Sequence, residues 1–521
     1  MENNGLISLL KEKYGLVPLS IDEPNADETY LACAPAKFGA FCMALHKELS
    51  SPVMAMFARE IDKGFRIYCA FLSKGRKKWF FATLDVKKED PQFDSIAKEI
   101  YSANLFEREM KEMFGIEPKG NPDRRRLHLH DEVWPRGYYP LRKDFIPPAD
   151  TGKLGEYEFV KVEGEGIYEV PVGPVHAGII GPGHFRFSVA GEPIINLEIR
   201  LGFTHRGVEK LMEGKSPLEA LKISECVAGD SSAAHALVFC LAIEKITKAK
   251  VPLKAQFIRA VFLELERMYS HAGDIGGIAL DVGFSQAAAL ASIIKESIHQ
   301  LNDKLSGSRF LRGAIVPGGI SKDISGGKKL IIDSLLSVMK DFRDLKKTLN
   351  SSISFLDRVD TTGMLTKKTA DDFGVLGVIG RASGIDTDLR RDVSSIYEKL
   401  DFKSVVSQSG DVLGRLNVRF DEFEASVNII QKCLDMMPPY ESVAMNIPYC
   451  EGYALGCAEG WRGPVLYWLS IDKSGKIERC KIVDPSFRSW PGLSYAVLEN
   501  IIPDFPVCNK SFDLSYAGGD L

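Results

Sequence analysis

The chain has 521 residues, of which 45% are hydrophobic and 26% are charged, as in an ordinary globular protein of about two to four domains. This composition excludes a collagen, a coiled coil and a largely disordered chain. The 66 Lys and Arg residues nearly balance the 70 Asp and Glu residues, for a formal net charge of -4. That balance supplies no electrostatic reason to expect a nucleic-acid partner.

The first segment, residues 1–145, has a mixed pattern that predicts a small α/β domain. Residues 67–71 and 79–84 are expected to be paired strands across a basic turn, and residues 96–113 have a helical period. A tail rich in proline and charge follows, with the basic run Arg124–Arg126. The simplest interpretation of that run is a solvated or interface patch.

Residues 146–170 are rich in Pro, Gly and Glu and predict a linker. The remaining segment, 171–521, is predicted to be mainly helical with β structure at its ends. It opens with the strand-like stretch 172–201 and closes with strands around the turn 472–475. The fold class is therefore α+β. The best helical patterns are 218–246, 255–281, 285–305, 328–356 and 412–436.

The ten cysteines are dispersed, and no two of them form a CxxC pair. The spacing signatures of iron–sulfur clusters and structural zinc sites are thus missing, and the pattern is typical of a reducing cytosol. The first residues, MENNGLISLLKEKYG, carry charges where a secretory signal is apolar, and no stretch of about 18 apolar residues occurs. We expect any membrane contact to be made through partner subunits.

General catalytic motifs leave the chain unassigned. It contains no GxGxxG, GxSxG or HExxH pattern. Gly214-Lys215-Ser216 resembles the end of a P-loop, but Glu209 stands where the first glycine belongs, so a phosphate cradle is not expected.

Two long stretches resemble a known family. Residues 106–145, FEREMKEMFGIEPKGNPDRRRLHLHDEVWPRGYYPLRKDF, resemble the 30 kDa peripheral-arm subunit of respiratory complex I. The large segment resembles the large subunit of membrane-bound, energy-converting [NiFe] hydrogenases, the relatives of the 49 kDa complex I subunit. This second resemblance is carried by GPVHAGIIGPGHFRF (173–187), ELERMYSHAGDIGG (264–277), GRASGIDTDLRRD (380–392) and AEGWRGPVLYW (458–468).

The resemblance raises the question of a metal centre. In [NiFe] hydrogenases four cysteine thiolates from two CxxC pairs hold the nickel, and two of them bridge to iron; soft, ionised ligands are needed there. The corresponding positions here are Ala228, Ser231, Ser486 and Ser489. Alanine offers no donor, and a serine hydroxyl stays protonated at neutral pH. We therefore expect no metal at these former ligand positions.

Complex I relatives that lack these cysteines place a quinone in the vacated cavity, where a His and a Tyr bind its head group. His184 is the candidate for the His, with His176 as the second choice; a loop histidine bonded to backbone is the alternative. The Tyr position aligns with Gly229, so that half of the pattern is missing. Ser231 or Asp230 is a candidate polar replacement.

Three further residues follow from the resemblance. His271 matches a His that faces the iron–sulfur cluster of a neighbouring small subunit, or is a satisfied buried histidine. Arg462 matches an Arg beside the hydrogenase metal site; here it either holds an anionic or carbonyl group or pairs with Glu459 or Asp484. Asp484, before a proline, is either a proton carrier or a turn residue.

The resemblance implies a subunit of a membrane-bound, ion-pumping oxidoreductase complex, which passes electrons from an iron–sulfur partner to a quinone or another small acceptor. The expected partners are a small subunit with a 4Fe-4S cluster, a ferredoxin-like subunit and antiporter-like membrane subunits. The expected location is the cytoplasmic face of the cell membrane, with no nucleic-acid partner. The alternatives are a structural or coupling subunit without chemistry and, more remotely, an active hydrogenase of the formate hydrogenlyase type.

Overall fold

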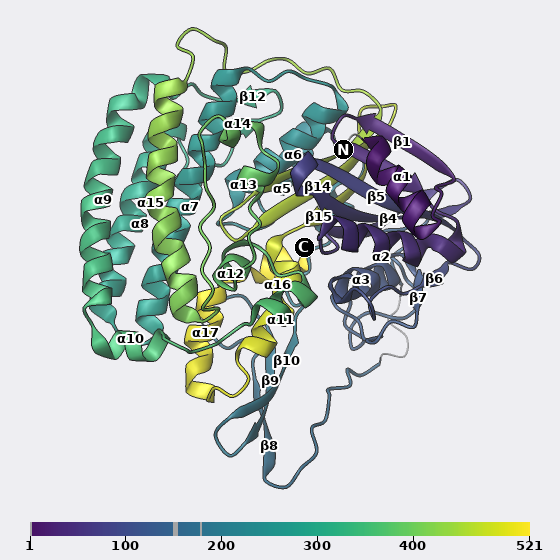
Figure 1. Ribbon diagram of the computed structural model, residues 1–521, viewed down its shortest axis with the longest axis horizontal. Helices are drawn as coiled ribbons and strands as arrows, with labels where there is room; N and C mark the ends of the chain where they lie inside the picture. The colour runs from purple at the N-terminus through teal and green to yellow at the C-terminus, as the bar shows by residue number, and fades with distance from the viewer. Residues whose placement is uncertain (1–2, 150–154, 178–179) are drawn as a thin grey trace.

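The computed structural model describes residues 3–149, 155–177 and 180–521. It confirms the α+β fold class. Figure 1 shows a bundle of long helices on the left, small sheets in the centre and a sheet-containing N-terminal part on the right. A narrow ribbon of strands projects below the body of the molecule.

The N-terminal part is built on one five-stranded sheet in the order β1-β2-β5-β4-β3. β2 and β5 are parallel, and the other neighbours are antiparallel. The expected pair of strands is confirmed as β4 and β5, which pair from Gly64–Lys87 to Ser73–Lys78. The strands are β1 (Ser20–Asn25), β2 (Glu28–Ala32), β3 (Ala55–Ile61), β4 (Gly64–Ser73) and β5 (Lys78–Lys87).

The helix expected over 96–113 is shorter than predicted and forms α3 (Asn104–Phe114). The buried carboxylate of Glu107 accepts hydrogen bonds from Ser95 Oγ at 2.5 Å and from the backbone N–H of Ile96 at 2.8 Å. These bonds hold the residues before α3 in a turn. The other elements here are α1 (Asn3–Tyr14), α2 (Phe38–Leu49), β6 (Gln92–Asp94) and β7 (Glu117–Lys119).

The projecting ribbon is a three-stranded antiparallel sheet in the order β10-β9-β8. Its strands are β8 (Ile167–Val172), β9 (His184–Ala190) and β10 (Ile194–Arg200), so β8 begins inside the segment predicted as a linker. The linker is tied to the body: Gly155 N–H donates to the carbonyl of Asp131, and Val160 N–H donates to Glu198.

Four long helices form the bundle, and three of the helical patterns match them closely. They are α7 (Leu253–Asp281), α8 (Ser285–Ser306), α9 (Lys328–Asn350) and α15 (Val412–Met436). The pattern 328–356 is interrupted because Ser352 accepts a hydrogen bond from the backbone N–H of Phe355 and starts a new helix, α10 (Ile353–Val359).

The pattern 218–246 is also wrong as one helix. It consists of α5 (Pro217–Ser224) and α6 (Ser232–Ile246), separated by the loop 225–231. Glu225, in this loop, uses its carboxylate to accept from the backbone N–H of Gly313 at 2.6 Å.

The C-terminal sheet has three antiparallel strands, β13 (Gly452–Glu459), β14 (Pro464–Ile471) and β15 (Ile477–Val483). The alternating pattern indicated β14 and β15 around the turn 472–475, but not β13. α16 (Pro485–Ala496) follows directly. The remaining elements are α4 (Val208–Met212), β11 (Ile315–Val316), β12 (Gly319–Ile320), α11 (Lys367–Phe373), α12 (Gly377–Ala382), α13 (Leu389–Asp392), α14 (Ser395–Glu398), α17 (Phe505–Phe512) and α18 (Tyr516–Asp520).

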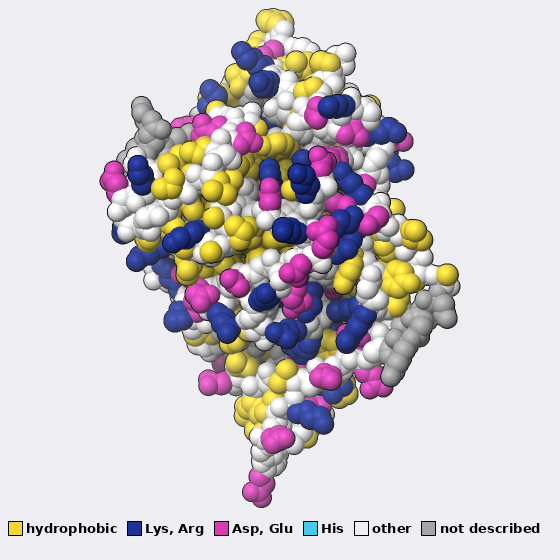
Figure 2. Space-filling view, turned by 90° about the vertical axis from the view of Figure 1, so that its right-hand side faces the viewer, with side chains coloured by type: hydrophobic (Ala, Val, Ile, Leu, Met, Phe, Trp, Pro, Cys, Tyr) yellow, Lys and Arg dark blue, Asp and Glu magenta, His cyan; other side chains and the backbone are white. Residues whose placement is uncertain are grey.

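The N-terminal part is docked on the C-terminal sheet by buried polar contacts. Lys481 Nζ lies 2.6 Å from both carboxylate oxygens of Glu109, and Tyr30 OH accepts from Trp468 Nε1 at 3.0 Å. Figure 2 shows that both signs of charge are interspersed on the face at the right of Figure 1. Within the described residues, we find no helix with the length and apolar character needed to span a membrane.

Candidate functional site

Three segments that are distant in sequence meet around Arg462. They are the loop 225–231, the turn between β13 and β14, and the start of α16 with the residues 513–515 beside it. The short connections force this meeting, because β14 and β15 lead directly from the turn at Arg462 to Asp484 at the start of α16.

The Arg462 side chain is buried, and each of its guanidinium nitrogens has a hydrogen-bond acceptor within the chain. Its Nη1 and Nη2 donate to the carboxylate of Asp230 at 2.8 and 2.7 Å, and Nη2 lies 3.3 Å from Asp513 Oδ2. Its Nε donates to the carbonyl of Asp513, and the guanidinium lies 3.9 Å from the ring centroid of Trp461. Burial opposes the charge, but Asp230 and then Asp513 outweigh it and raise the pKa of Arg462.

Of the two alternatives for Arg462, the pairing with Glu459 or Asp484 is wrong, and the binding of an anionic or carbonyl group stays a prediction. Glu459 instead pairs with Arg381, at 2.7 Å, and Asp484 makes no direct ion pair with Arg462 in the described structure. Asp484 acts on Arg462 only through its charge at longer range. The Asp230–Arg462–Asp513 cluster is thus the electrostatic centre of the site.

Asp484 is the N-cap of α16. Its Oδ1 accepts from the backbone N–H of Ser486 at 2.7 Å, and its Oδ2 lies 3.2 Å from His235 Nε2. His235 Nδ1 in turn lies 2.9 Å from Tyr467 OH. Burial raises the pKa of Asp484, but the bond to His235 and the charge of Arg462 outweigh burial, so the net pKa is lowered. The turn-residue interpretation therefore describes its geometry.

The four positions assigned to former metal ligands contribute no thiolate. Ser231 Oγ accepts from Arg462 Nη1 at 3.4 Å, Ser486 Oγ accepts from the backbone N–H of Ser515 at 2.9 Å, and Ser489 Oγ donates to the carbonyl of Pro485 at 2.8 Å. Ala228 is buried. Three hard hydroxyls and a methyl in place of thiolates do not fit nickel. The described residues include no group of three or more His, Cys, Asp or Glu that could hold a metal ion.

Of the two candidate histidines, His176 lies nearer to this site. His176 Nε2 is 3.4 Å from Tyr516 OH, and Tyr516 follows Ser515, whose N–H donates to Ser486. His184 begins β9, and its ring lies 5.1 Å from that of Phe159. Burial lowers the pKa of His184, and its Nε2 has no hydrogen-bond partner in the described structure.

His271 is fully buried on α7. Its Nε2 lies 2.9 Å from Glu422, and its Nδ1 has no hydrogen-bond partner in the described structure. Burial lowers the pKa of His271 to about 4 despite the carboxylate of Glu422. Its ring lies 6.2 Å from that of Trp461, which places it behind Arg462.

A second acidic group lies behind Asp513. Lys510 Nζ pairs with Asp513 at 2.6 Å and lies 4.0 Å from Asp274, which itself accepts from Arg419 at 2.7 Å. Burial, and then the charge of Asp513, raise the pKa of Asp274 to about 7. Asp274 is therefore a carboxyl group that can hold a proton near neutral pH.

Sequence reasoning missed Asp513, Asp274, Tyr516 and His235 as members of this site. Asp513 lies 51 residues beyond Arg462 in the sequence. No sequence motif marks Asp513, because its place beside Arg462 depends on how α17 packs against α16. Tyr516, on α18, contacts His176 although the two residues are 340 positions apart in the sequence.

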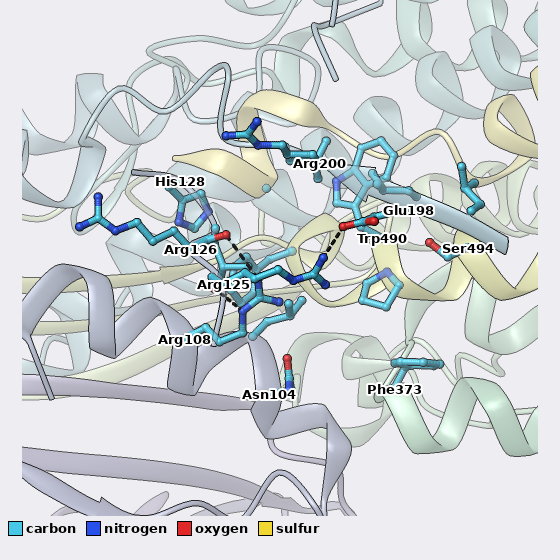
Figure 3. A pocket seen from close by; sticks show the side chains of 18 of the residues that line it. Asn104, Arg108, Arg125, Arg126, His128, Glu198, Arg200, Phe373, Trp490 and Ser494 are labelled. Carbon is cyan, nitrogen blue, oxygen red and sulfur yellow. Dashed lines mark hydrogen bonds and ion pairs between the residues drawn. The ribbon is translucent and has the colours of Figure 1, made fainter. Parts of the chain in front are cut away.

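A cavity of about 320 Å³ lies elsewhere, between α3, β10 and α16 (Figure 3). It is lined by Arg108, Arg125, Glu198, Phe373, Trp490 and Ser494, among others. Among the described residues, none of the predicted site residues lines it. The sequence indicated only the basic run on its rim.

Comparison with known proteins assigns the chain to a class. The family profile described as "Respiratory-chain NADH dehydrogenase, 30 Kd subunit" matches residues 31–151, and that described as "Respiratory-chain NADH dehydrogenase, 49 Kd subunit" matches residues 281–451. The class is thus that of chains in which both kinds of subunit are fused.

The chain is 32% identical to formate hydrogenlyase subunit 5 of Escherichia coli (strain K12), over 89% of this chain and 83% of the relative. It is 30% identical to the NADH-quinone oxidoreductase C/D protein of Bacteroides thetaiotaomicron, over 72% of this chain and 75% of the relative. The chain belongs to the family of these fused complex I and hydrogenase large subunits. Of the stretches that carry the resemblance, residues 106–145 lie within the range matched by the 30 kDa subunit profile and residues 380–392 within that matched by the 49 kDa subunit profile.

A known structure has the same fold. One chain in the structure of the membrane-bound sulfane sulfur reductase, described as an archaeal respiratory membrane complex, superimposes with a TM-score of 0.64. It is 26% identical, and the match covers 68% of this chain and 99% of that chain.

Proposed function

We propose that the chain is a peripheral subunit of a membrane-bound, ion-pumping oxidoreductase complex, in which it helps to pass electrons from an iron–sulfur partner to a quinone or another small acceptor. The names of its relatives support this proposal, since they include a quinone oxidoreductase protein and a chain of a sulfane sulfur reductase complex. The partners would be a small iron–sulfur subunit, a ferredoxin-like subunit and antiporter-like membrane subunits. The location would be the cytoplasmic face of the membrane.

One observation carries the proposal: the four positions assigned to nickel ligands carry Ala228, Ser231, Ser486 and Ser489, whereas a buried Arg462 is present beside them. A site of this kind lacks the thiolates for nickel but keeps a fixed positive charge. An acceptor gains negative charge as electrons arrive, and a preorganised guanidinium stabilises that charge. Asp274, with a pKa of about 7, is a nearby group able to hold a proton.

The acceptor's head group would lie against His176 and Tyr516. The two side chains are 3.4 Å apart, and both an imidazole N–H and a phenol O–H can donate to a carbonyl oxygen. Tyr516 would then supply the phenol that Gly229 cannot. His184 is the second candidate, since its Nε2 has no partner in the described structure.

The test is a reoxidation assay on the purified complex. The cluster of the iron–sulfur partner is reduced, and its reoxidation by a short-chain quinone is followed by electron paramagnetic resonance. We expect reoxidation within the turnover time, and slowing of about tenfold or more in Arg462→Lys and Tyr516→Phe. A cluster that no quinone and no polysulfide reoxidises would contradict the proposal.

A second function, that of a structural or coupling subunit without chemistry, is favoured by the bonding of the site. Arg462 has protein partners for its donors, and the hydroxyls of Ser486 and Ser489 are bonded within the chain. If alanine at His176, His184 and Arg462 left turnover of the assembled complex unchanged, this second function would be the correct one.

A further inference from the structure

The cavity between α3, β10 and α16, which we call the seam cavity, lies beside the proposed acceptor site. Phe487, Trp490 and Ser494 line it, at a spacing that places them on one face of the helix. Trp490 also packs on Tyr516, with the ring centroids 4.8 Å apart. Among the described residues, neither His176 nor Tyr516 lines the seam cavity, so a ligand there does not depend on the proposed function.

The wall nearest to the N-terminal part is cationic. Arg108 and Arg125 lie at the centre of the cavity wall in Figure 3, with Arg126, Arg200 and His128 around them. Burial disfavours the charge on His128, but the hydrogen bond and charge of Glu112 raise its pKa to about 9. The wall thus carries five positive groups near neutral pH.

The carboxylates that balance these cations lie behind the wall. Arg125 pairs with Asp123 at 2.8 Å, Arg200 with Glu132 at 2.5 Å and His128 with Glu112 at 2.9 Å. None of these three carboxylates is among the described residues that line the cavity. The charged residues that line the cavity are therefore five cations and two carboxylates, those of Glu198 and Asp520.

The two acidic residues that do line the cavity are already saturated with donors. Glu198 accepts from Tyr157 OH and from Val160 N–H, both at 2.8 Å, and it pairs with Arg125. Asp520 accepts from the backbone N–H groups of Gly202 and Thr204 and from the Thr204 hydroxyl. Neither carboxylate is free to bind a cationic ligand.

The opposite wall is apolar and aromatic. It is formed by Phe373, Phe487, Trp490, Leu197 and Tyr495, so the cavity pairs a cationic side with a flat hydrophobic side. Two N–H groups of the lining residues, Trp490 Nε1 and Arg200 Nε, have no acceptor among the described residues. A buried donor without a partner is uncommon in a finished structure.

We propose that the seam cavity binds a small organic anion that carries a carboxylate on a flat apolar body. The carboxylate would share Arg108 and Arg125 with Asp123 and Glu198, which already pair with them, and the apolar body would lie between Trp490 and Phe373. The cavity volume of about 320 Å³ is at the lower end of the range for small-molecule sites. Because its walls come from three distant parts of the chain, such a ligand would hold α16 against the N-terminal part.

The test is isothermal titration calorimetry of the purified full chain with 2-naphthoate. Two matched probes separate the contributions: 2-naphthol has the body without the charge, and inorganic phosphate has the charge without the body. We expect one 2-naphthoate per chain, bound about tenfold more tightly than either probe, and weaker binding as KCl rises from about 50 to about 500 mM. Equal binding of 2-naphthol, or equal binding of phosphate, would overturn the proposed ligand class.

Variants locate the site. Ser494→Trp fills the cavity and should abolish binding, whereas Ser494→Ala should leave it unchanged. Ser337→Trp makes the same change at an exposed position of α9 and serves as the control. Arg200→Gln should weaken 2-naphthoate binding several-fold, and Arg200→Lys should restore it. Unchanged binding in both Ser494→Trp and Arg200→Gln would show that the ligand lies elsewhere and would overturn the proposal.

Discussion

Arg462 illustrates how a single residue can be found from a resemblance while its environment is not. The motif GWRG marks the arginine, but its partners come from a loop 232 residues earlier and a turn 51 residues later. A charge buried to this extent needs such partners, because desolvation alone would strongly disfavour it. Its two carboxylates are therefore as much part of the site as the arginine.

Replacing Arg462 by alanine tests this pairing. The change removes the hydrogen bonds to Asp230 and Asp513 and leaves Lys510 as the remaining ion-pair partner of Asp513, so we expect the free energy of unfolding to fall by about 1.5–3 kcal/mol in urea denaturation. Arg66→Ala breaks the exposed pair with Asp85 and should cost at most about 1 kcal/mol. Equal losses in the two variants would contradict a buried ion cluster at Arg462.

His128 predicts a pH dependence of stability. Burial disfavours its charged form, but Glu112 outweighs burial and raises its pKa from 6.5 to about 9 in the folded chain. A raised pKa stabilises the fold fully below pH 6.5, and this contribution is lost as the pH rises through 9. It amounts to at most about 3 kcal/mol.

The measurement compares urea denaturation of the parent protein and His128→Asn across this pH range. The parent should lose more stability between pH 6.5 and 9 than the variant does. Parallel curves for the two proteins would show that His128 titrates normally.

At the scale of elements, the sequence predicts the long helices with a continuous apolar face better than it predicts the short helices. The pattern 412–436 matches α15 because one continuous apolar face packs against α7 and α9. The pattern 328–356 fails where Ser352 caps a new helix, and the pattern 218–246 fails at the loop 225–231, where α6 starts without a side-chain cap. α16 itself is short, and its start depends on Asp484 rather than on periodicity.

Asp484 should therefore set the stability of α16. Asp484→Ala removes the cap and leaves His235 without its acceptor, so we expect a loss of about 2–4 kcal/mol in the free energy of unfolding. Asp484→Asn keeps a capping oxygen and should lose about half of that. Ser352→Ala, at the cap of α10, provides the scale for a simple cap, about 1 kcal/mol. A loss no larger than that of Ser352→Ala would show that the bond to His235 contributes nothing.

At the scale of the whole molecule, the two matched parts are joined by more than a linker. Besides the bond of Lys481 to Glu109, Glu28 accepts from the backbone N–H of Leu455, and Arg488 donates to the carbonyl of Met54. Contacts of this kind cannot be predicted from sequence periodicity, because each partner looks like an ordinary surface charge in its own segment. The boundaries 1–145 and 171–521 remain predictions about domains.

These contacts predict one cooperative unfolding transition. Urea denaturation followed by far-ultraviolet circular dichroism and by tryptophan fluorescence should give coincident curves. Lys481→Met leaves Glu109 buried without its partner and should shift both curves together, by about 3 kcal/mol. Two separated transitions would mean that the N-terminal part unfolds alone.

The resemblance placed Arg462, Asp484, Ser231 and Ser486 in one region, and the structure brings these four together. The resemblance favoured His184 over His176 as the residue that binds the quinone head group, whereas in the structure it is His176 that contacts Tyr516. The sequence indicated only the basic run Arg124–Arg126 of the seam cavity, because its other walls come from distant segments of the chain.

The most direct test of the central claim is elemental analysis of the purified complex for nickel and iron. The four candidate ligand positions offer no thiolate, so we expect iron in the amounts that clusters of the partner subunits require, and no nickel. One nickel per chain would mean that other residues hold the metal, and it would contradict the proposed nickel-free site.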